Sequence, residues 1–147
     1  MNLLGLINTA DQDVAVNGVV NLGNAYRRYC TKNNCGVTTF STNGTSVTLQ
    51  QKGIYHITAT ITFTAPVAGD VIFQLTENGV ALPGATATET VTTATTEFNT
   101  TVIDYYVLVG STILLNKIAT EAKAIAIVNT GVASTVTNVV FNVDKVL

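Results

Sequence analysis

The chain has 147 residues, of which 47% are hydrophobic and 11% are charged. This length and apolar content suffice for one compact domain with a hydrophobic core. The net charge of −2 and the pI of about 5.1 argue against a protein that reads a nucleic-acid backbone, because such a protein needs a basic stripe. No run approaches the roughly 20 apolar residues of a membrane-spanning helix. The composition therefore predicts neither a nucleic-acid partner nor a membrane span.

The scarcity of charge is itself informative. In soluble domains about a quarter of the residues are usually charged, so another residue type must cover much of this surface. The 26 threonines fill that role, because β-branched Thr suits the solvated face of a sheet. So few charges also suggest that each subunit buries part of its surface against a partner. A monomer with a Thr and Asn surface is the alternative.

The N-terminal residues 1–13 are predicted to form a docking segment or arm outside the domain. Leu3, Leu4, Leu6 and Ile7 are apolar, with one glycine between them. The run lacks a basic flank and ends too early for a secretory signal peptide. Because apolar residues at a terminus are costly in water and stabilising once covered, we expect these four side chains to dock the protein onto a larger assembly.

The first strand is predicted over Val14–Leu22, whose apolar even positions face one way, with Gly18 as a bulge or kink. A loop is expected to follow, and it carries both cysteines, Cys30 and Cys35. A disulfide can close so short a loop, and two free thiols are the alternative. Two thiols are too few for a structural zinc site, and His56 is the only histidine. No metal or other cofactor is therefore expected.

The same loop contains three of the seven Lys and Arg residues, namely Arg27, Arg28 and Lys32. Tyrosines flank the two arginines, which allows two interpretations. In the first, Tyr26 and Tyr29 pack against the domain while the charged groups stay in water. In the second, the cluster is a patch that docks an acidic partner or an anionic glycan.

The middle of the chain indicates two half-buried strands and a hairpin turn after the second. Apolar residues occupy every odd position of Ile54–Phe63 and alternate with His and Thr, which is the period of a strand with one dry face. The same phase resumes in Val71–Leu75, and Asn78-Gly79 then supplies a hairpin turn. The chain is therefore predicted to be an antiparallel β protein.

Further strands are predicted, in chain order, over Val37–Phe40, Ser46–Leu49, Val80–Pro83, Ile113–Ile118, Ala124–Val128 and Val136–Val143. Threonine-rich Ala85–Thr96 is interpreted as an edge strand with a polar loop. The total is about eight to ten strands with a turn signal every 8–12 residues, which is typical of an antiparallel β-sandwich or jelly roll. An immunoglobulin-type sandwich is disfavoured, because the chain has no Trp and its two cysteines are too close in sequence to bridge two sheets.

The segment Val102–Val109 differs from the other strands because apolar residues occupy both of its faces. Val102, Tyr106 and Leu108 share one face, and the alternate residues share the other. In an antiparallel sheet such a strand needs cover on both sides, so the core is expected to cover one face and a second subunit the other. The residues predicted at this interface are Val102, Ile103, Tyr105, Tyr106, Val107 and, from the closing strand, Phe141.

Three features together resemble the trimeric jelly roll of the complement globular head and tumour necrosis factor superfamily, in its bacterial and phage branch. They are Gly53-Ile54-Tyr55-His56-Ile57 at the head of the long strand, Leu75-Thr76-Glu77-Asn78-Gly79 in a hairpin, and a hydrophobic closing strand. The resemblance covers a single jelly-roll domain, residues 14–147. It implies a homotrimer in which one sheet of each subunit lines the three-fold axis. The chain departs from many members in having no collagen-like stalk.

Asp104 is the single acid in the apolar strand Val102–Val109. One interpretation makes it the hydrogen-bond partner of a Tyr hydroxyl, or of a Lys or Arg across the interface. The other makes it a calcium ligand at a trimer apex.

No catalytic constellation is visible, because one His and nine scattered acids form neither a nucleophile with its base nor a carboxylate pair. The protein is therefore predicted not to be an enzyme. The first function class is a structural or surface-decoration protein of a phage virion or similar particle, bound to a capsid or other particle surface protein after synthesis in a cytoplasm without a signal peptide. The second is a soluble module that binds a host receptor or glycan through its loops. The apolar N-terminal segment favours the first class.

Overall fold

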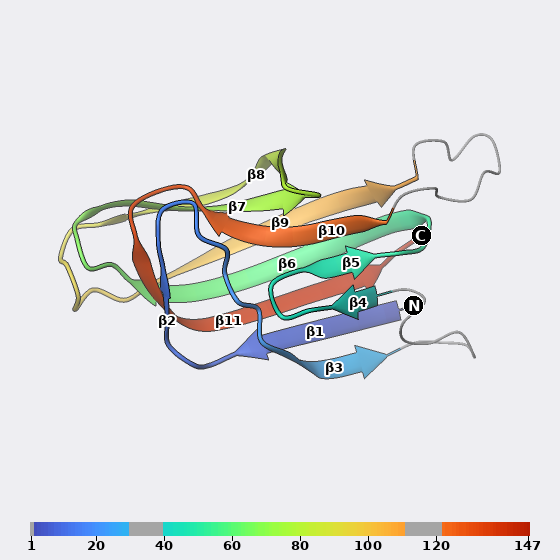
Figure 1. Ribbon diagram of the computed structural model, residues 1–147, viewed down its shortest axis with the longest axis horizontal. Coiled ribbons are helices and arrows are strands. Elements are labelled where there is room, and N and C mark those ends of the chain that lie inside the picture. The colour runs from blue at the N-terminus through green and yellow to red at the C-terminus, as the bar shows by residue number, and fades with distance from the viewer. Residues whose placement is uncertain (1, 30–39, 111–121) are drawn as a thin grey trace.

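The computed structural model describes residues 2–29, 40–110 and 122–147. In these residues the chain forms β-strands, and both chain ends lie at the same end of an elongated molecule (Figure 1). The strands are β1 (Asn2–Asn8), β2 (Gln12–Val14), β3 (Asn24–Tyr29), β4 (Phe40–Thr42), β5 (Val47–Leu49), β6 (Gly53–Thr64), β7 (Gly69–Glu77), β8 (Val80–Val91), β9 (Asn99–Val109), β10 (Lys123–Asn129) and β11 (Ser134–Lys145).

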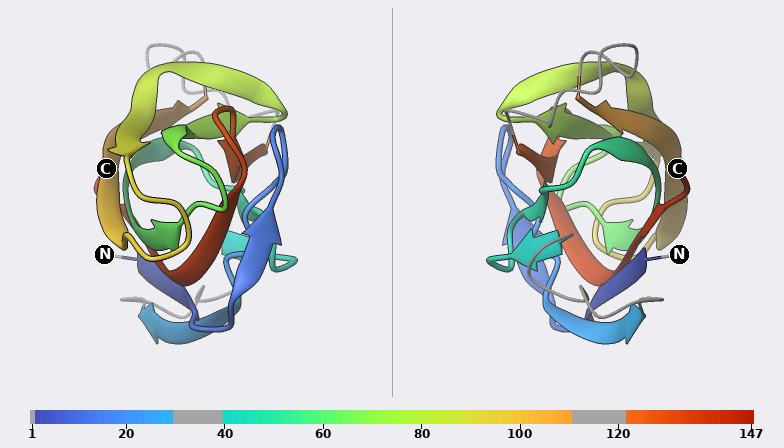
Figure 2. Two further views of the ribbon diagram at one scale, coloured as in Figure 1. Left: turned by 90° about the vertical axis from the view of Figure 1, so that its left-hand side faces the viewer. Right: turned by 90° about the vertical axis from the view of Figure 1, so that its right-hand side faces the viewer.

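The strands form two antiparallel sheets packed face to face. The six-stranded sheet has the order β3-β1-β11-β6-β9, with β2 paired to β11, and the five-stranded sheet has the order β4-β5-β10-β7-β8. Viewed along the long axis, β3 lies at the bottom of the molecule and β8 at the top (Figure 2). Sequence neighbours are thus often separated in space, and β1 pairs with the last strand, β11. The predicted all-β jelly-roll sandwich is confirmed.

The core lies between the two sheets and follows the predicted alternation. In β6 every odd side chain from Tyr55 to Phe63 is fully buried, while the even positions are half-buried. Phe73 of β7 meets Phe63 edge to face, with ring centroids 5.3 Å apart. The turn after β7 also matches its sequence signal, because Asn78 and Gly79 have φ angles of 50° and 82°, as a type I′ hairpin turn requires. The predictions for this part of the chain are confirmed.

The predicted strand Val14–Leu22 is not continuous. Strand β2 ends at Val14, and Asn17 then turns the chain with a φ of 64°. Beyond the turn, Val20 and Leu22 are nevertheless fully buried. The apolar spacing that predicted the strand is therefore real, but it comes from a strand and a following loop that both contribute to one core.

The N-terminal residues also differ from the prediction of a separate arm over residues 1–13. Strand β1 lies between β3 and β11, with Leu4 opposite Val143 and Leu6 opposite Phe141. Both leucine side chains are fully buried in the core. Hydrogen bonds to two neighbouring strands and burial on one face make β1 part of the domain, because its apolar residues find their cover within the same chain.

The loop predicted after Leu22 contains a further strand, β3 (Asn24–Tyr29), at the edge of the six-stranded sheet. Several other predictions lie outside the described residues: Lys32, Cys30 with Cys35, Ile113–Ile118, and Val37–Phe40 apart from Phe40 itself, which begins β4.

Candidate functional site

Strand β9 separates two environments. Its inward side chains belong to the core, where Ile103 and Val107 are 2% and 3% exposed. Three of its outward side chains, Val102, Tyr106 and Leu108, are also apolar, yet they are 53%, 62% and 43% exposed. The predicted division of this strand into two apolar faces is confirmed. Among the residues that the structure describes, the chain covers only the inward face.

The residues predicted at the subunit interface therefore divide into three groups. Ile103, Val107 and Phe141 are buried in the core of their own chain, so they cannot contact a partner. Tyr105 is half-buried, and its hydroxyl donates a hydrogen bond to the carbonyl oxygen of Pro83 at 2.9 Å. Val102 and Tyr106 remain available. A period of two identifies two faces but does not say which of them is inward.

A polar cluster occupies the outward side of β6, β9 and β11. The Nε2 atom of His56 lies 2.6 Å from Oδ1 of Asp104, and its Nδ1 atom lies 3.7 Å from Oδ1 of Asp144. The imidazole ring stacks on the ring of Tyr106, with centroids 4.6 Å apart and planes 19° apart. Register explains this meeting, because His56 is directly opposite Tyr106 on one side and Asp144 on the other. The contact between His56 and Asp104 differs from the partners predicted for this acid, which were a Tyr hydroxyl, a Lys or Arg across the interface, or calcium.

The opposite end of the sheet carries an aromatic and cationic group. Tyr26 is the extra residue of a β-bulge in β3 and lies over Gly5 of β1. Its hydroxyl donates a hydrogen bond to Oδ1 of Asn142 at 3.1 Å, and the guanidinium carbon of Arg27 lies 5.5 Å from the centre of its ring. A Cβ atom on Gly5 would lie 2.8 Å from both the Tyr26 ring and the Asn142 side chain, so only glycine leaves room for this arrangement.

Tyr26 packs over β1, as the first interpretation of the basic loop expects, while the second interpretation, a patch that docks an acidic partner or an anionic glycan, stays a prediction. All six residues of β3 are exposed, Arg28 and Tyr29 included.

The four predicted docking residues of the N-terminal segment divide into a buried pair and a half-buried pair. Leu4 and Leu6 belong to the core, whereas Leu3 and Ile7 are half-buried on the outward side of β1.

We use the term outer face for the outward side of the six-stranded sheet. Its central members are Leu3, Ile7, Tyr26, Arg27, His56, Val102, Asp104, Tyr106, Leu108, Asn142 and Asp144. Exposed tyrosines and an arginine among apolar side chains are typical of protein–protein interfaces. The outer face therefore offers apolar, aromatic and cationic groups to a complementary surface.

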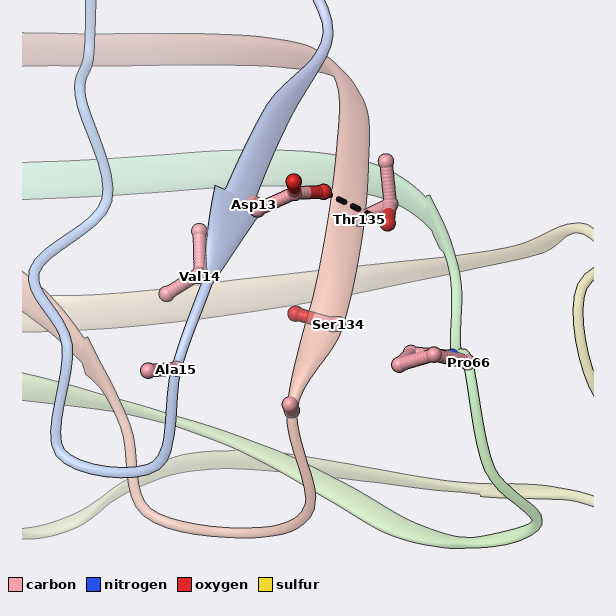
Figure 3. A pocket seen from close by; sticks show the side chains of 7 residues that line it. Asp13, Val14, Ala15, Pro66, Ser134 and Thr135 are labelled. Carbon is pink, nitrogen blue, oxygen red and sulfur yellow. Dashed lines mark hydrogen bonds between the residues drawn. The ribbon is translucent and has the colours of Figure 1, made fainter.

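A small hollow lies at the end of the sandwich away from the chain ends (Figure 3). Its volume is about 290 Å³, and it is lined by Asp13, Val14, Ala15, Pro66, Ala133, Ser134 and Thr135. The one acid in this lining, Asp13, accepts a hydrogen bond from the Thr135 hydroxyl at 3.0 Å. The hollow thus offers neither a carboxylate pair nor a nucleophile with a histidine base.

Within residues 2–29, 40–110 and 122–147, no three His, Cys, Asp or Glu side chains are grouped so as to hold a metal ion. No helix in the described part of the chain is long and apolar enough to cross a membrane.

No family model and no curated protein matches the sequence. Solved structures match its fold over nearly the whole chain. The globular domain of the zebrafish complement 1qA protein has a TM-score of 0.65 and 9% identity, and the match covers 100% of this chain and 98% of that one. Murine APRIL has a TM-score of 0.60 and 10% identity, with 97% and 98% covered. The PRD1 vertex protein has a TM-score of 0.54 and 13% identity, with 99% and 97% covered.

The chain has the jelly-roll fold of these proteins. The resemblance predicted from sequence to the complement head and tumour necrosis factor proteins is thus confirmed for the fold, which is all that identities of this size can show. The outer face belongs to the six-stranded layer of this jelly roll, and none of these three similar structures bears the name of an enzyme.

Proposed function

We propose that this protein is a non-enzymatic structural or surface-decoration component of a particle such as a phage virion, and that it assembles as a homotrimer through the outer face. The observation that carries the proposal is the exposure of Val102, Tyr106 and Leu108 on one side of β9. One of the similar structures is a vertex protein by name, which supports a role on a particle surface.

The energetics of the outer face favour association. Fully burying an exposed Val or Leu side chain contributes about 1.5–3 kcal/mol, and Val102 and Leu108 are about half exposed, so covering each of them contributes about half of that value. The face also has Tyr and Arg, the residue types that dominate binding energy at interfaces. Three copies are proposed because the superfamily that the sequence resembles is trimeric, and because only 11% of the residues are charged.

Sedimentation of the purified full chain tests the assembly. We expect a trimer at micromolar concentration, and we expect Val102→Asp to give a folded monomer, because a charge in a dry interface costs several kcal/mol. Thr88→Asp is the matched control. Thr88 is an exposed residue on the outward side of β8 in the other sheet, so this variant should remain trimeric. A monomeric unmodified protein, or a trimeric Val102→Asp variant, would refute the assembly.

The particle role has its own test. Particles purified from the native source should contain the protein in a fixed number of copies, as measured by quantitative mass spectrometry. Recovery of the protein entirely as a free soluble species would rule out this role. The expected partner is a capsid or other particle surface protein.

A further inference from the structure

The two ends of the outer face carry opposite charges in the same row of the sheet. Register places Arg27 opposite Gly5, Gly5 opposite Asn142, Asn142 opposite Thr58, and Thr58 opposite Asp104. This row crosses the sheet from β3 to β9, which are the two ends of its strand order. With neighbouring strands about 4.8 Å apart, the two charged residues lie about 19 Å from each other. They cannot pair within one subunit.

Arg27 is held in place without a carboxylate. Its guanidinium group lies against the ring of Tyr26, which is itself fixed by its hydrogen bond to Asn142. No ion pair within the described part of the chain involves Arg27. Arg28 is different, because it lies opposite Leu4, whose side chain is in the core, and its register position therefore belongs to the inward side of β3. Of the two arginines, the register assigns only Arg27 to the outer face.

Asp104 has room for a second partner. Its side chain is 61% exposed, and the contact with His56 uses only its Oδ1 atom. A carboxylate has two oxygens with about four acceptor sites and can accept a guanidinium group through both oxygens. The neighbourhood is also acidic, because Asp104 and Asp144 both face the single imidazole of His56.

We infer that Arg27 of one copy pairs with Asp104 of the next, so that the β3 end of one outer face contacts the β9 end of its neighbour. The inference rests on the homotrimer proposed above. A contact between two different ends of one surface is head-to-tail, and repeated with a closing rotation it generates a ring in which every subunit provides one Arg27 and one Asp104. The pair fixes the orientation of the contact, since the wrong ends would bring like charges together.

Charge reversal tests the pairing. Arg27→Glu should weaken assembly at least about tenfold in sedimentation at several protein concentrations, because it opposes Asp104 with a second negative charge. Arg28→Glu makes the same charge change one residue away, at an inward register position, and should assemble within about threefold of the unmodified protein. Circular dichroism confirms that each variant is folded.

The decisive variant carries both Arg27→Glu and Asp104→Arg. It restores opposite charges at every contact, so it should assemble at least about threefold more tightly than Arg27→Glu alone. Full recovery is not expected, because the variant also removes the contact between His56 and Asp104. A trimeric unmodified protein whose Arg27→Glu variant assembles equally well, or whose double variant assembles no better than that single variant, overturns the pairing and leaves the trimer intact. A monomeric unmodified protein overturns both.

Discussion

Strands β1 and β9 belong to the same sheet and are both apolar on two faces, yet the chain covers them differently. In β1, Leu4 and Leu6 are fully buried on the inward side, and Gly5 on the outward side is buried under Tyr26. In β9 the inward side is covered as well, but Val102 and Tyr106 remain exposed.

The position of each strand in the sheet explains the difference. Strand β1 is interior and has β3 beside it, so the bulged Tyr26 can fold back over it. Strand β9 ends the strand order and has β6 as its one ladder partner among the described strands. An apolar segment therefore indicates that cover is needed, while its place in the sheet decides whether the same chain or a partner provides it.

Truncation of the buried leucines of β1 is expected to have the largest effect. A buried Leu→Ala change costs about 2–5 kcal/mol, so Leu4→Ala with Leu6→Ala should remove about 4–10 kcal/mol, which is comparable with the whole stability of a domain. Urea denaturation followed by circular dichroism measures this loss. Leu3→Ala is the control, because Leu3 is half-buried on the outward side of the same strand and should cost much less.

A double variant that kept its stability to within about 1 kcal/mol would show that β1 is peripheral to the domain, as its sequence alone suggests. The same result would remove the contrast with β9, since β1 would then not be the strand that its own chain covers.

Local periodicity predicted most of the fold. The alternation of a half-buried sheet is present in β6, β7, β9, β10 and β11. Two residues, Asn78 and Gly79, suffice to identify a hairpin turn. The position of β1 has no such local signal. Its partners, such as Val143 for Leu4, lie at the far end of the sequence, and an apolar terminal run is the same whether it enters a sheet or binds another protein.

The candidate site was less accessible to sequence reasoning. The alternation correctly divided β9 into two faces, but inward and outward could not be distinguished before the sheets were packed. The cluster of His56, Asp104 and Asp144 depends on the register of three strands that are distant in sequence. The one available signal was that His56 and Asp144 alternate with apolar residues along their strands.

An added methyl group at Gly5 is expected to cause an intermediate loss of stability. It tests whether Tyr26 covers β1. In Gly5→Ala the new Cβ would lie 2.8 Å from the Tyr26 ring, so the ring must move or the strand must shift. Such overpacking costs about 1–3 kcal/mol. The cost should be measured by urea denaturation in two backgrounds, the unmodified chain and Tyr26→Ala.

If Tyr26 is what occupies the space above Gly5, the alanine should cost much less once the ring is gone, although Asn142 still limits the relief. Equal costs in the two backgrounds would mean that the ring does not cover β1, and the explanation for the different exposure of β1 and β9 would fail.

The smallest expected effect comes from Tyr55, which reports on the dry side of β9. Tyr55 is opposite Val107 in the sheet, its side chain is fully buried, and its hydroxyl donates a hydrogen bond to the Gln51 carbonyl oxygen at 2.6 Å. Burial raises the pKa of Tyr55 from 10.0 to about 12. The folded state therefore holds this hydroxyl neutral at pH values where the unfolded chain ionises it. The resulting stability is fully present below pH 10 and is lost as the pH rises towards 12.

Tyr55→Phe should cost about 0.5–1.5 kcal/mol at neutral pH, the net value of one hydrogen bond, and should also remove this alkaline loss. In urea denaturation the unmodified protein should start more stable than the variant, and the gap should narrow between pH 10 and 12. Tyr106→Phe is the matched control, since Tyr106 lies on the exposed side of β9 and this variant retains Tyr55 and the alkaline decline. A gap that stays constant over this pH range would mean that Tyr55 ionises as easily in the folded state as in the unfolded chain. Water would then reach the inward side of β9. The contrast between a dry inward face and an exposed outward face, on which the proposed contact with a partner depends, would fail.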